Sequence, residues 1–268
     1  MKMIFIFVLF FIGILIITAL PASAAGVKDG LLVFFTFDKA IGDQVTDMSG
    51  NKHDGTLKSG AKIVTDIKKY GTGAIRIEGA TQQMEVKTFK ELEEYVNHTY
   101  LFWIYFTAPP TGGWDSIFAK PAPGSDRSPG AWATAQGTLA IHWRYNPGNA
   151  GFQALGPNGE GSAFDKEKWY HVAGVKKGTD LSAYVDGKNV GKATVPAAIT
   201  QGVYSLFIGQ SPAYGGSAAK FIMDDFFGYN RVLADDEINT LMTKGAQAFP
   251  VEPKDKLTST WGNIKDGN

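Results

Sequence analysis

The sequence predicts an all-β protein built as an antiparallel sandwich or barrel. Short apolar runs rich in aromatic and β-branched residues recur along the chain, and turn signals rich in glycine separate them. Only one segment near the C-terminus has a convincing helical pattern. The 32 glycines and 12 prolines among 268 residues suit many tight turns better than long helices.

Ten apolar runs are expected to form strands, and two of them also indicate their neighbours or their place in a sheet. The dipeptide Asp186-Gly187 is typical of a two-residue type I′ hairpin, so the runs on either side of it should pair. The run 99–106 is apolar on both faces, which predicts a central strand that is covered on both sides. The ten runs are residues 31–37, 73–77, 83–86, 99–106, 116–119, 138–145, 168–175, 181–185, 204–209 and 219–230.

Residues 138–145 show the alternation of a strand with one buried face. One set of side chains should face the core, and the other set carries hydrogen-bonding groups that could meet a ligand. The expected core set is Leu139, Ile141, Trp143 and Tyr145, and the other set is Ala140, His142 and Arg144. Trp169, at the start of the next long run, is expected in the core as well.

The predicted helix covers residues 234–247. Leu233 and Ile238 are spaced as a hydrophobic staple, and three acidic residues in the first turn complement the positive end of the helix dipole. Ala234 is a poor N-cap that costs about 1 kcal/mol relative to serine. Gly245 can close the helix. Arg231, which precedes the helix, is expected to pair with a nearby acid or to cap carbonyls.

The N-terminal residues 1–24 read as an export signal. Lys2 supplies a basic start, Ile4 to Leu20 an apolar segment, and Ala22-Ser23-Ala24 a small-residue cleavage pattern. Cleavage after Ala24 is expected, which would place the protein in the secreted, cell-surface or periplasmic fraction. The alternative is an uncleaved membrane anchor, because the apolar segment is long for a signal.

Composition then limits the possible partners of the remaining chain, which divides into a domain at 25–248 and a tail at 249–268. Basic and acidic residues number 26 each, so no overall field favours nucleic acid or an anionic membrane. A membrane contact is expected only if the signal stays uncleaved. With no cysteine, disulfides, cysteine metal sites and thiol catalysis are excluded.

Seven blocks in one order resemble the laminin-G-like jelly roll of the concanavalin A-like lectin/glucanase superfamily, over about residues 30–245. This resemblance implies a two-sheet antiparallel jelly-roll sandwich with one short C-terminal helix. It also implies an exported module that binds glycans, or proteins at a cell surface or in a matrix. The blocks are LLVFFTFD, DMSGNKHDGTL, YGTGAIRIEG, FWIYF, KWYHVAGVKKGTDLSAYVDGKNV, YSLFIGQ and FIMDDFFGYNRVLADDEINTL.

The resemblance also implies a structural calcium near the terminal strands, because calcium prefers carboxylate, amide and carbonyl oxygens. The candidate ligands are Asp38 and Asp225 through their side chains, and the turn from Asp47 to Asn51 through its carbonyls. The alternative is that these residues only form Asx turns. Asp224 and Asp225 alternate along a strand, so at most one of them is expected to face the site.

Five residues are candidates for carbohydrate binding, since sugar rings stack on aromatic side chains and their hydroxyls need polar partners. They are Trp114, Trp132, His142, Arg144 and Tyr214. The alternative is that the aromatic residues cover the core as packing lids.

No pattern of a known catalytic site occurs in the chain. The E-x-D-x-x-E triplet of related glycanases is absent, as are G-x-S-x-G, H-E-x-x-H and the phosphate-binding loop. We therefore expect a non-catalytic module that binds a glycan or polysaccharide. A protein-binding adhesion module is the first alternative, and a glycan hydrolase or lyase with an unrecognised carboxylate pair is the second.

Overall fold

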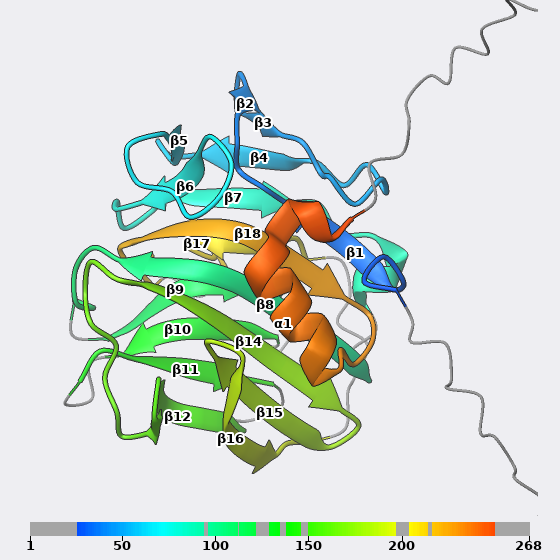
Figure 1. Ribbon diagram of the computed structural model, residues 1–268. Helices are drawn as coiled ribbons and strands as arrows, with labels where there is room; N and C mark the ends of the chain where they lie inside the picture. Colours follow the sequence, from blue (N-terminus) through cyan, green and yellow to red (C-terminus); the bar gives the residue numbers. More distant parts are fainter. Residues whose placement is uncertain are drawn as a thin grey trace, which may run out of the picture.

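The computed structural model shows two antiparallel sheets packed face to face, with one helix against the outer face of the first sheet (Figure 1). The two-sheet jelly-roll sandwich expected from the sequence is confirmed. The structure describes residues 26–93, 96–111, 113–121, 129–134, 138–145, 150–196, 204–213 and 216–249.

The first sheet has eight strands in the order β16-β15-β14-β8-β18-β6-β5, and β1 also pairs with β18. The apolar run around residues 99–106 becomes β8, which lies between β14 and β18 and is central as predicted. Asp186-Gly187 forms the hairpin between β15 and β16, also as predicted. The strands are β1 (Leu31–Phe35), β5 (Lys62–Val64), β6 (Ala74–Ile77), β8 (Asn97–Phe106), β14 (Trp169–Lys177), β15 (Asp180–Val185), β16 (Lys188–Thr194) and β18 (Phe221–Tyr229).

The second sheet has ten strands in the order β13-β12-β11-β10-β9-β17-β7-β4-β3-β2. Short strands at both ends of this order give the sheet small edges, which limits pairing with other chains. The strands are β2 (Ala40–Ile41), β3 (Gln44–Val45), β4 (Gly55–Lys58), β7 (Gln83–Val86), β9 (Trp114–Ala119), β10 (Gly130–Thr134), β11 (Ala140–Arg144), β12 (Gly151–Gly156), β13 (Gly159–Glu160) and β17 (Leu206–Gly209).

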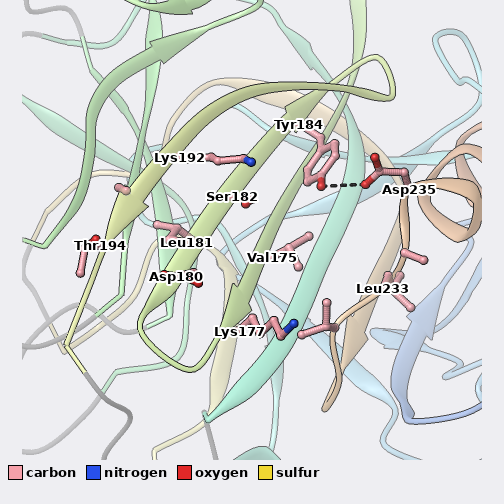
Figure 2. A pocket seen from close by; sticks show the side chains of 13 residues that line it. Val175, Lys177, Asp180, Leu181, Ser182, Tyr184, Lys192, Thr194, Leu233 and Asp235 are labelled. Carbon is pink, nitrogen blue, oxygen red and sulfur yellow. Dashed lines mark hydrogen bonds between the residues drawn. The ribbon is translucent and has the colours of Figure 1, made fainter.

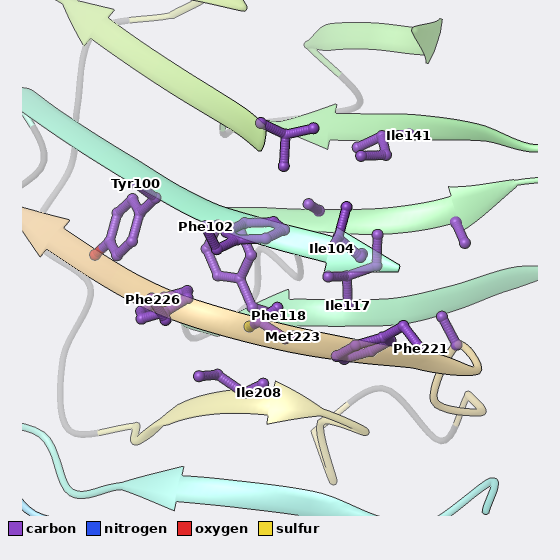
Figure 3. Close-up of a cluster of buried hydrophobic side chains, with 14 of the residues drawn as sticks. Tyr100, Phe102, Ile104, Ile117, Phe118, Ile141, Ile208, Phe221, Met223 and Phe226 are labelled. Atoms are coloured by element: carbon purple, nitrogen blue, oxygen red, sulfur yellow. The ribbon is translucent and has the colours of Figure 1, made fainter. Parts of the chain in front are cut away.

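The main core lies between the two sheets and is rich in aromatic rings (Figure 3). Phe102 of β8 packs against Phe118 of β9 with ring centroids 5.7 Å apart, and Phe226 of β18 lies 5.8 Å from Phe102. The face assignment on β11 is confirmed. The core contains Leu139, Ile141, Trp143 and Tyr145, whereas His142 and Arg144 lie on the other face.

A second apolar cluster joins the helix α1 (Asp235–Lys244) to the outer face of the eight-stranded sheet. The helix begins after Ala234, whose N–H donates to the carboxylate of Glu237 at 2.9 Å. Arg231 forms a salt bridge of 2.6 Å with the same carboxylate, as expected for a structural arginine. Two short 3₁₀ helices complete the structure, η1 (Lys90–Glu93) and η2 (Gly245–Ala248).

Two residues lie differently from what the sequence suggests. Trp169 was expected in the core, but it is partly exposed on the outer face and packs on Tyr105 with ring centroids 5.5 Å apart. Phe249 was assigned to the tail, but it stacks on Phe34 at 5.2 Å and so extends the packed domain by one residue.

The expected export signal and the tail beyond Phe249 lie outside the described residues. Within the part of the chain that the structure describes, no helix has the length and apolar character needed to span a membrane.

Candidate functional site

A buried pair of carboxylates, Asp224 and Asp225, lies where β18 departs from regular strand geometry. The ladder between β18 and β8 shifts register after Asp224, and Asp225 has a φ of 46°, so the strand bulges here. The expected alternation of the two side chains is therefore wrong. Both residues are buried, Asp224 with 0% and Asp225 with 2% of its surface exposed. Burial and then the charges of Asp225 and Asp224 raise the pKa of Tyr70 in the neighbouring segment.

The two carboxylates differ in their hydrogen bonds. Asp224 accepts the backbone N–H groups of Lys69 at 2.8 Å, Tyr70 at 2.9 Å and Asp225 at 2.9 Å. Asp225 Oδ2 makes no hydrogen bond within the described residues. A buried acceptor without a donor is unfavourable, and more so when it carries charge.

The pKa values reflect this environment. Burial raises the pKa of Asp225 to about 8, with further contributions from the charges of Asp224 and Asp38. Burial also raises the pKa of Asp224 to about 7, although its backbone donors act in the opposite direction. At neutral pH the pair therefore holds at least part of a proton, unless a cation replaces it.

Asp38 follows the end of β1, and its charge contributes to the raised pKa values of both Asp224 and Asp225. Its Oδ1 accepts the N–H and the hydroxyl of Thr72. Two glycines allow the close approach of backbone and carboxylates. A Cβ at Gly71, with φ of 53°, would collide with the Asp38 carboxylate, and a Cβ at Gly245, with φ of 49°, would collide with Asp225 Oδ2.

The carboxylate of Asp47 lies in a different environment, because both of its oxygens accept hydrogen bonds from β1 and from the turn. It accepts the N–H of Phe34 at 3.0 Å, the N–H and hydroxyl of Ser49 at 2.9 and 2.7 Å, and the N–H of His53 at 3.0 Å. These bonds make Asp47 the capping residue of the turn and join the turn to β1.

Asn51 completes the same turn by donating its amide to the carbonyls of Leu31 at 2.8 Å and Leu32 at 3.0 Å. The turn thus contacts the first part of β1, whereas Asp38 follows the other end of that strand. Phe34 and Asp38 are four residue steps apart, which spans at most about 13 Å along the chain. Asp38 lies close enough for its charge to help raise the pKa of Asp225, whereas the side chains of Asp47 and Asn51 are occupied within the turn, so only the carbonyls of that turn remain as candidate ligands.

Among the described residues, no group of three or more histidine or acidic side chains could hold a metal ion. A cation at Asp38 and Asp225 would therefore have two carboxylates and would need backbone carbonyls or water for its remaining ligands. Calcium accepts such mixed oxygen sets, and the unsatisfied Asp225 Oδ2 is compatible with it.

Four of the five predicted carbohydrate residues lie together on the outer face of the ten-stranded sheet. Trp132 of β10 is the ladder partner of His142 of β11, and their ring centroids are 6.5 Å apart. Trp114 of β9 lies 4.1 Å from the same imidazole. The Trp132 indole lies over Gly130, the ladder partner of Arg144.

Exposure differs within this group. Trp132, His142 and Arg144 are at most 4% exposed, while Trp114 is partly exposed. His142 Nδ1 donates to the carbonyl of Gln153 at 3.0 Å. Of these four residues, only Trp114 therefore has a side chain that a ligand can reach. Trp132, His142 and Arg144 form the packed layer around it. Tyr214, the fifth candidate, lies outside the described residues.

A pocket that the sequence analysis did not identify lies on the outer face of the other sheet, beside the start of α1 (Figure 2). Its volume is about 650 Å³. Strand alternation in Asp180, Ser182 and Tyr184 could have indicated an outward polar row. The wall formed by residues 232–235 could not be foreseen, because it depends on how the helix packs.

The family model Laminin_G_3, described as the concanavalin A-like lectin/glucanases superfamily, matches residues 78–239. The chain belongs to this family. No curated protein sequence is significantly similar to the chain.

Solved structures share the fold at low identity. A Trypanosoma rangeli sialidase in complex with 2,3-difluorosialic acid is 18% identical with a TM-score of 0.62, over 82% of this chain and 33% of the sialidase. The binding domain of Paraclostridial Mosquitocidal Protein 1 is 16% identical with a TM-score of 0.55, over 81% of this chain and 52% of that protein. This family member thus spans a third to a half of these structures, and the likeness concerns the fold.

Proposed function

We propose that the protein is an exported, non-catalytic module that binds carbohydrate on the outer face of the ten-stranded sheet. The observation that carries this proposal is the tilted contact of the Trp114 ring with His142, whose centroids lie 4.1 Å apart, supported by Trp132 and Arg144 on the neighbouring strands. A partly exposed indole on a rigid sheet offers the apolar face that a sugar ring needs.

Trp114 is the proposed contact residue, and the buried residues hold it in place. Because β9, β10 and β11 are hydrogen-bonded neighbours, the ring is presented with little conformational entropy to lose. The family of lectins and glucanases is consistent with this function. The sialidase of similar fold is in complex with 2,3-difluorosialic acid, which is consistent with a glycan ligand.

A glycan array followed by titration tests the proposal. Trp114→Ala should weaken binding of the best glycan about tenfold, because an aromatic stacking contact is lost. Trp169→Ala is the matched control, since Trp169 is also partly exposed but lies on the other sheet. Equal affinities for the wild type and Trp114→Ala would contradict the proposed site.

Other outcomes would favour the alternatives. If no glycan on the array binds and the protein captures a defined surface or matrix protein, the result would favour an adhesion module. Release of reducing sugar that disappears with one carboxylate substitution would favour a hydrolase or lyase.

A second proposal concerns calcium, which would be held by the carboxylates of Asp38 and Asp225. The orphaned Asp225 Oδ2 supports it, because a buried carboxylate oxygen lacking a donor gains a partner when a cation binds. Calcium there would stabilise the contact between β1, β18 and the segment around Tyr70. The role is structural, and Asp47 and Asn51 would contribute only by shaping the turn.

Thermal unfolding with chelator and then with added calcium tests this site. Calcium at 100 times its dissociation constant should stabilise the fold by about 2.7 kcal/mol. The stabilisation should vanish in Asp225→Asn and persist in Asp43→Asn, which changes an exposed turn acid of the same region. A wild-type melting temperature that does not respond to calcium would refute the site.

A further inference from the structure

The pocket on the eight-stranded sheet has a floor of three paired strands and a wall from the start of α1. On its floor, Val175 of β14, Ser182 of β15 and Lys192 of β16 form one row across the sheet, since each is the ladder partner of the next. Lys177 and Asp180 belong to the adjacent row. Val232 and Ala234 contribute to the wall.

Two lysines lie at opposite ends of this pocket, with Ser182 and Val175 between them (Figure 2). Lys177 and Lys192 are two strands and two residues apart, which corresponds to about 12 Å between their Cα atoms. Both side chains are exposed, and neither forms an ion pair among the residues that the structure describes. Two ammonium groups are thus available to a ligand that lies along the floor.

The acidic groups of the pocket are not equivalent. Asp235 accepts the hydroxyl of Tyr184 at 2.8 Å and lies in the first turn of α1, where the helix dipole offsets its charge. Asp180 is exposed and has no such partner in the described part of the chain, so its carboxylate can accept ligand hydroxyls. The charged lining is thus balanced at two lysines and two aspartates, but because Asp235 is occupied by Tyr184, the ligand meets two ammonium groups and one available carboxylate.

We propose that this pocket is a second saccharide site, selective for short oligosaccharides that carry carboxylates, such as oligouronides. Lys177 and Lys192 bind carboxylates near the two ends of the ligand, while Asp180 and Ser182 bind hydroxyls. Val175 and Val232 contact the C–H faces of the rings. The volume of about 650 Å³ lies within the range of ligand pockets. The site lies on the opposite sheet from Trp114 and rests on the proposed function only for the class of ligand.

Calorimetric titration with an oligogalacturonide, and with the same oligosaccharide after reduction of its carboxylates to alcohols, tests the site. Lys177→Ala and Lys192→Ala should each weaken binding of the acidic form about fivefold, and together about 25-fold. The reduced form should bind the wild type as weakly as the acidic form binds the double variant. Rising salt should weaken the acidic form.

Three further variants separate this site from general charge effects and from the Trp114 site. Ser182→Tyr should block the floor without changing charge, and Lys62→Ala should have no effect because this exposed lysine lies on β5, near the other edge of the sheet. Trp114→Ala should leave the affinity for the acidic form unchanged. All three proteins should keep the wild-type melting temperature within a few degrees.

The outcomes distinguish the two proposals. If the double lysine variant and Ser182→Tyr bind the acidic form like the wild type, the second site is wrong. If the loss follows Trp114→Ala instead, the second site is wrong and the Trp114 site is supported. If neutral glycans bind and acidic ones do not, only the second site is refuted. If no saccharide binds, both the second site and the Trp114 site are refuted.

Discussion

Two segments of this protein hold buried aspartates whose carboxylates are in opposite hydrogen-bonding states. In the turn from Asp47 to Asn51, the Asp47 carboxylate accepts four hydrogen bonds, and the segment is a finished structural unit. In the bulge of β18, Asp225 is equally buried but its Oδ2 has no donor within the described residues. Acidic residues in a loop therefore indicate a binding site only when their acceptors are left unsatisfied.

The largest effect on stability is expected at Asp47. Asp47→Ala should lower the free energy of unfolding by about 3–5 kcal/mol, because several backbone donors, including the buried N–H of Phe34, lose their acceptor. Urea denaturation measures this as a lower midpoint at unchanged slope. Asp43→Ala, in the exposed turn just before it, should change stability by no more than about 0.5 kcal/mol. A mild effect of Asp47→Ala would mean that the turn is not held by this carboxylate.

The pH dependence of stability should report the protonation of the Asp225 carboxylate. The pKa of an aspartate in the unfolded chain is about 3.9, whereas in the folded protein the pKa of Asp225 is about 8. The folded state thus keeps a proton that the unfolded state loses, and this stabilisation is lost as pH rises from about 4 to 8. In chelator, the free energy of unfolding should fall by about 1–3 kcal/mol between pH 5 and 7.

Asp225→Asn provides the control for that slope, since an amide does not titrate and has nearly the same shape. Unfolding at several pH values should give a flatter profile for the variant than for the wild type. The same slope in both proteins would assign the pH dependence to other groups.

The smallest expected effect is at Asp38. Asp38→Asn keeps one acceptor for Thr72 but removes a charge that raises the pKa of Asp225. In chelator at pH 8 the variant should be more stable than the wild type by about 0.5 kcal/mol, and at pH 5 the gain should be absent. Equal differences at both pH values would show that Asp38 and Asp225 do not interact.

The sequence was sufficient for much of the fold because local signals agreed with one another. Apolar alternation placed Leu139, Ile141, Trp143 and Tyr145 in the core, and Asp186-Gly187 marked its hairpin correctly. The helix start at Ala234 also followed from residues close in sequence. These features depend on residues that are neighbours in the sequence, so the sequence alone is enough to predict them.

The candidate site was harder to predict, because it depends on contacts between distant segments. The bulge that turns Asp224 and Asp225 toward Tyr70 breaks the period of two on which face assignment rests. Trp169 was placed in the core since its aromatic character suggested burial, yet the strand register puts it on the outer face. No pattern near Asp47 shows that its acceptors are filled by Phe34 and His53.

Gly245 also has a consequence for protein engineering. Replacing glycine by alanine is a common way to raise stability where the backbone conformation suits alanine, because it reduces the conformational freedom of the unfolded chain. Here the gain is outweighed, since the backbone at Gly245 has a positive φ and its missing side chain leaves room for the Asp225 carboxylate. The end of the helix and the acidic bulge are therefore constrained together, and a library designed to stabilise this domain should leave position 245 unchanged.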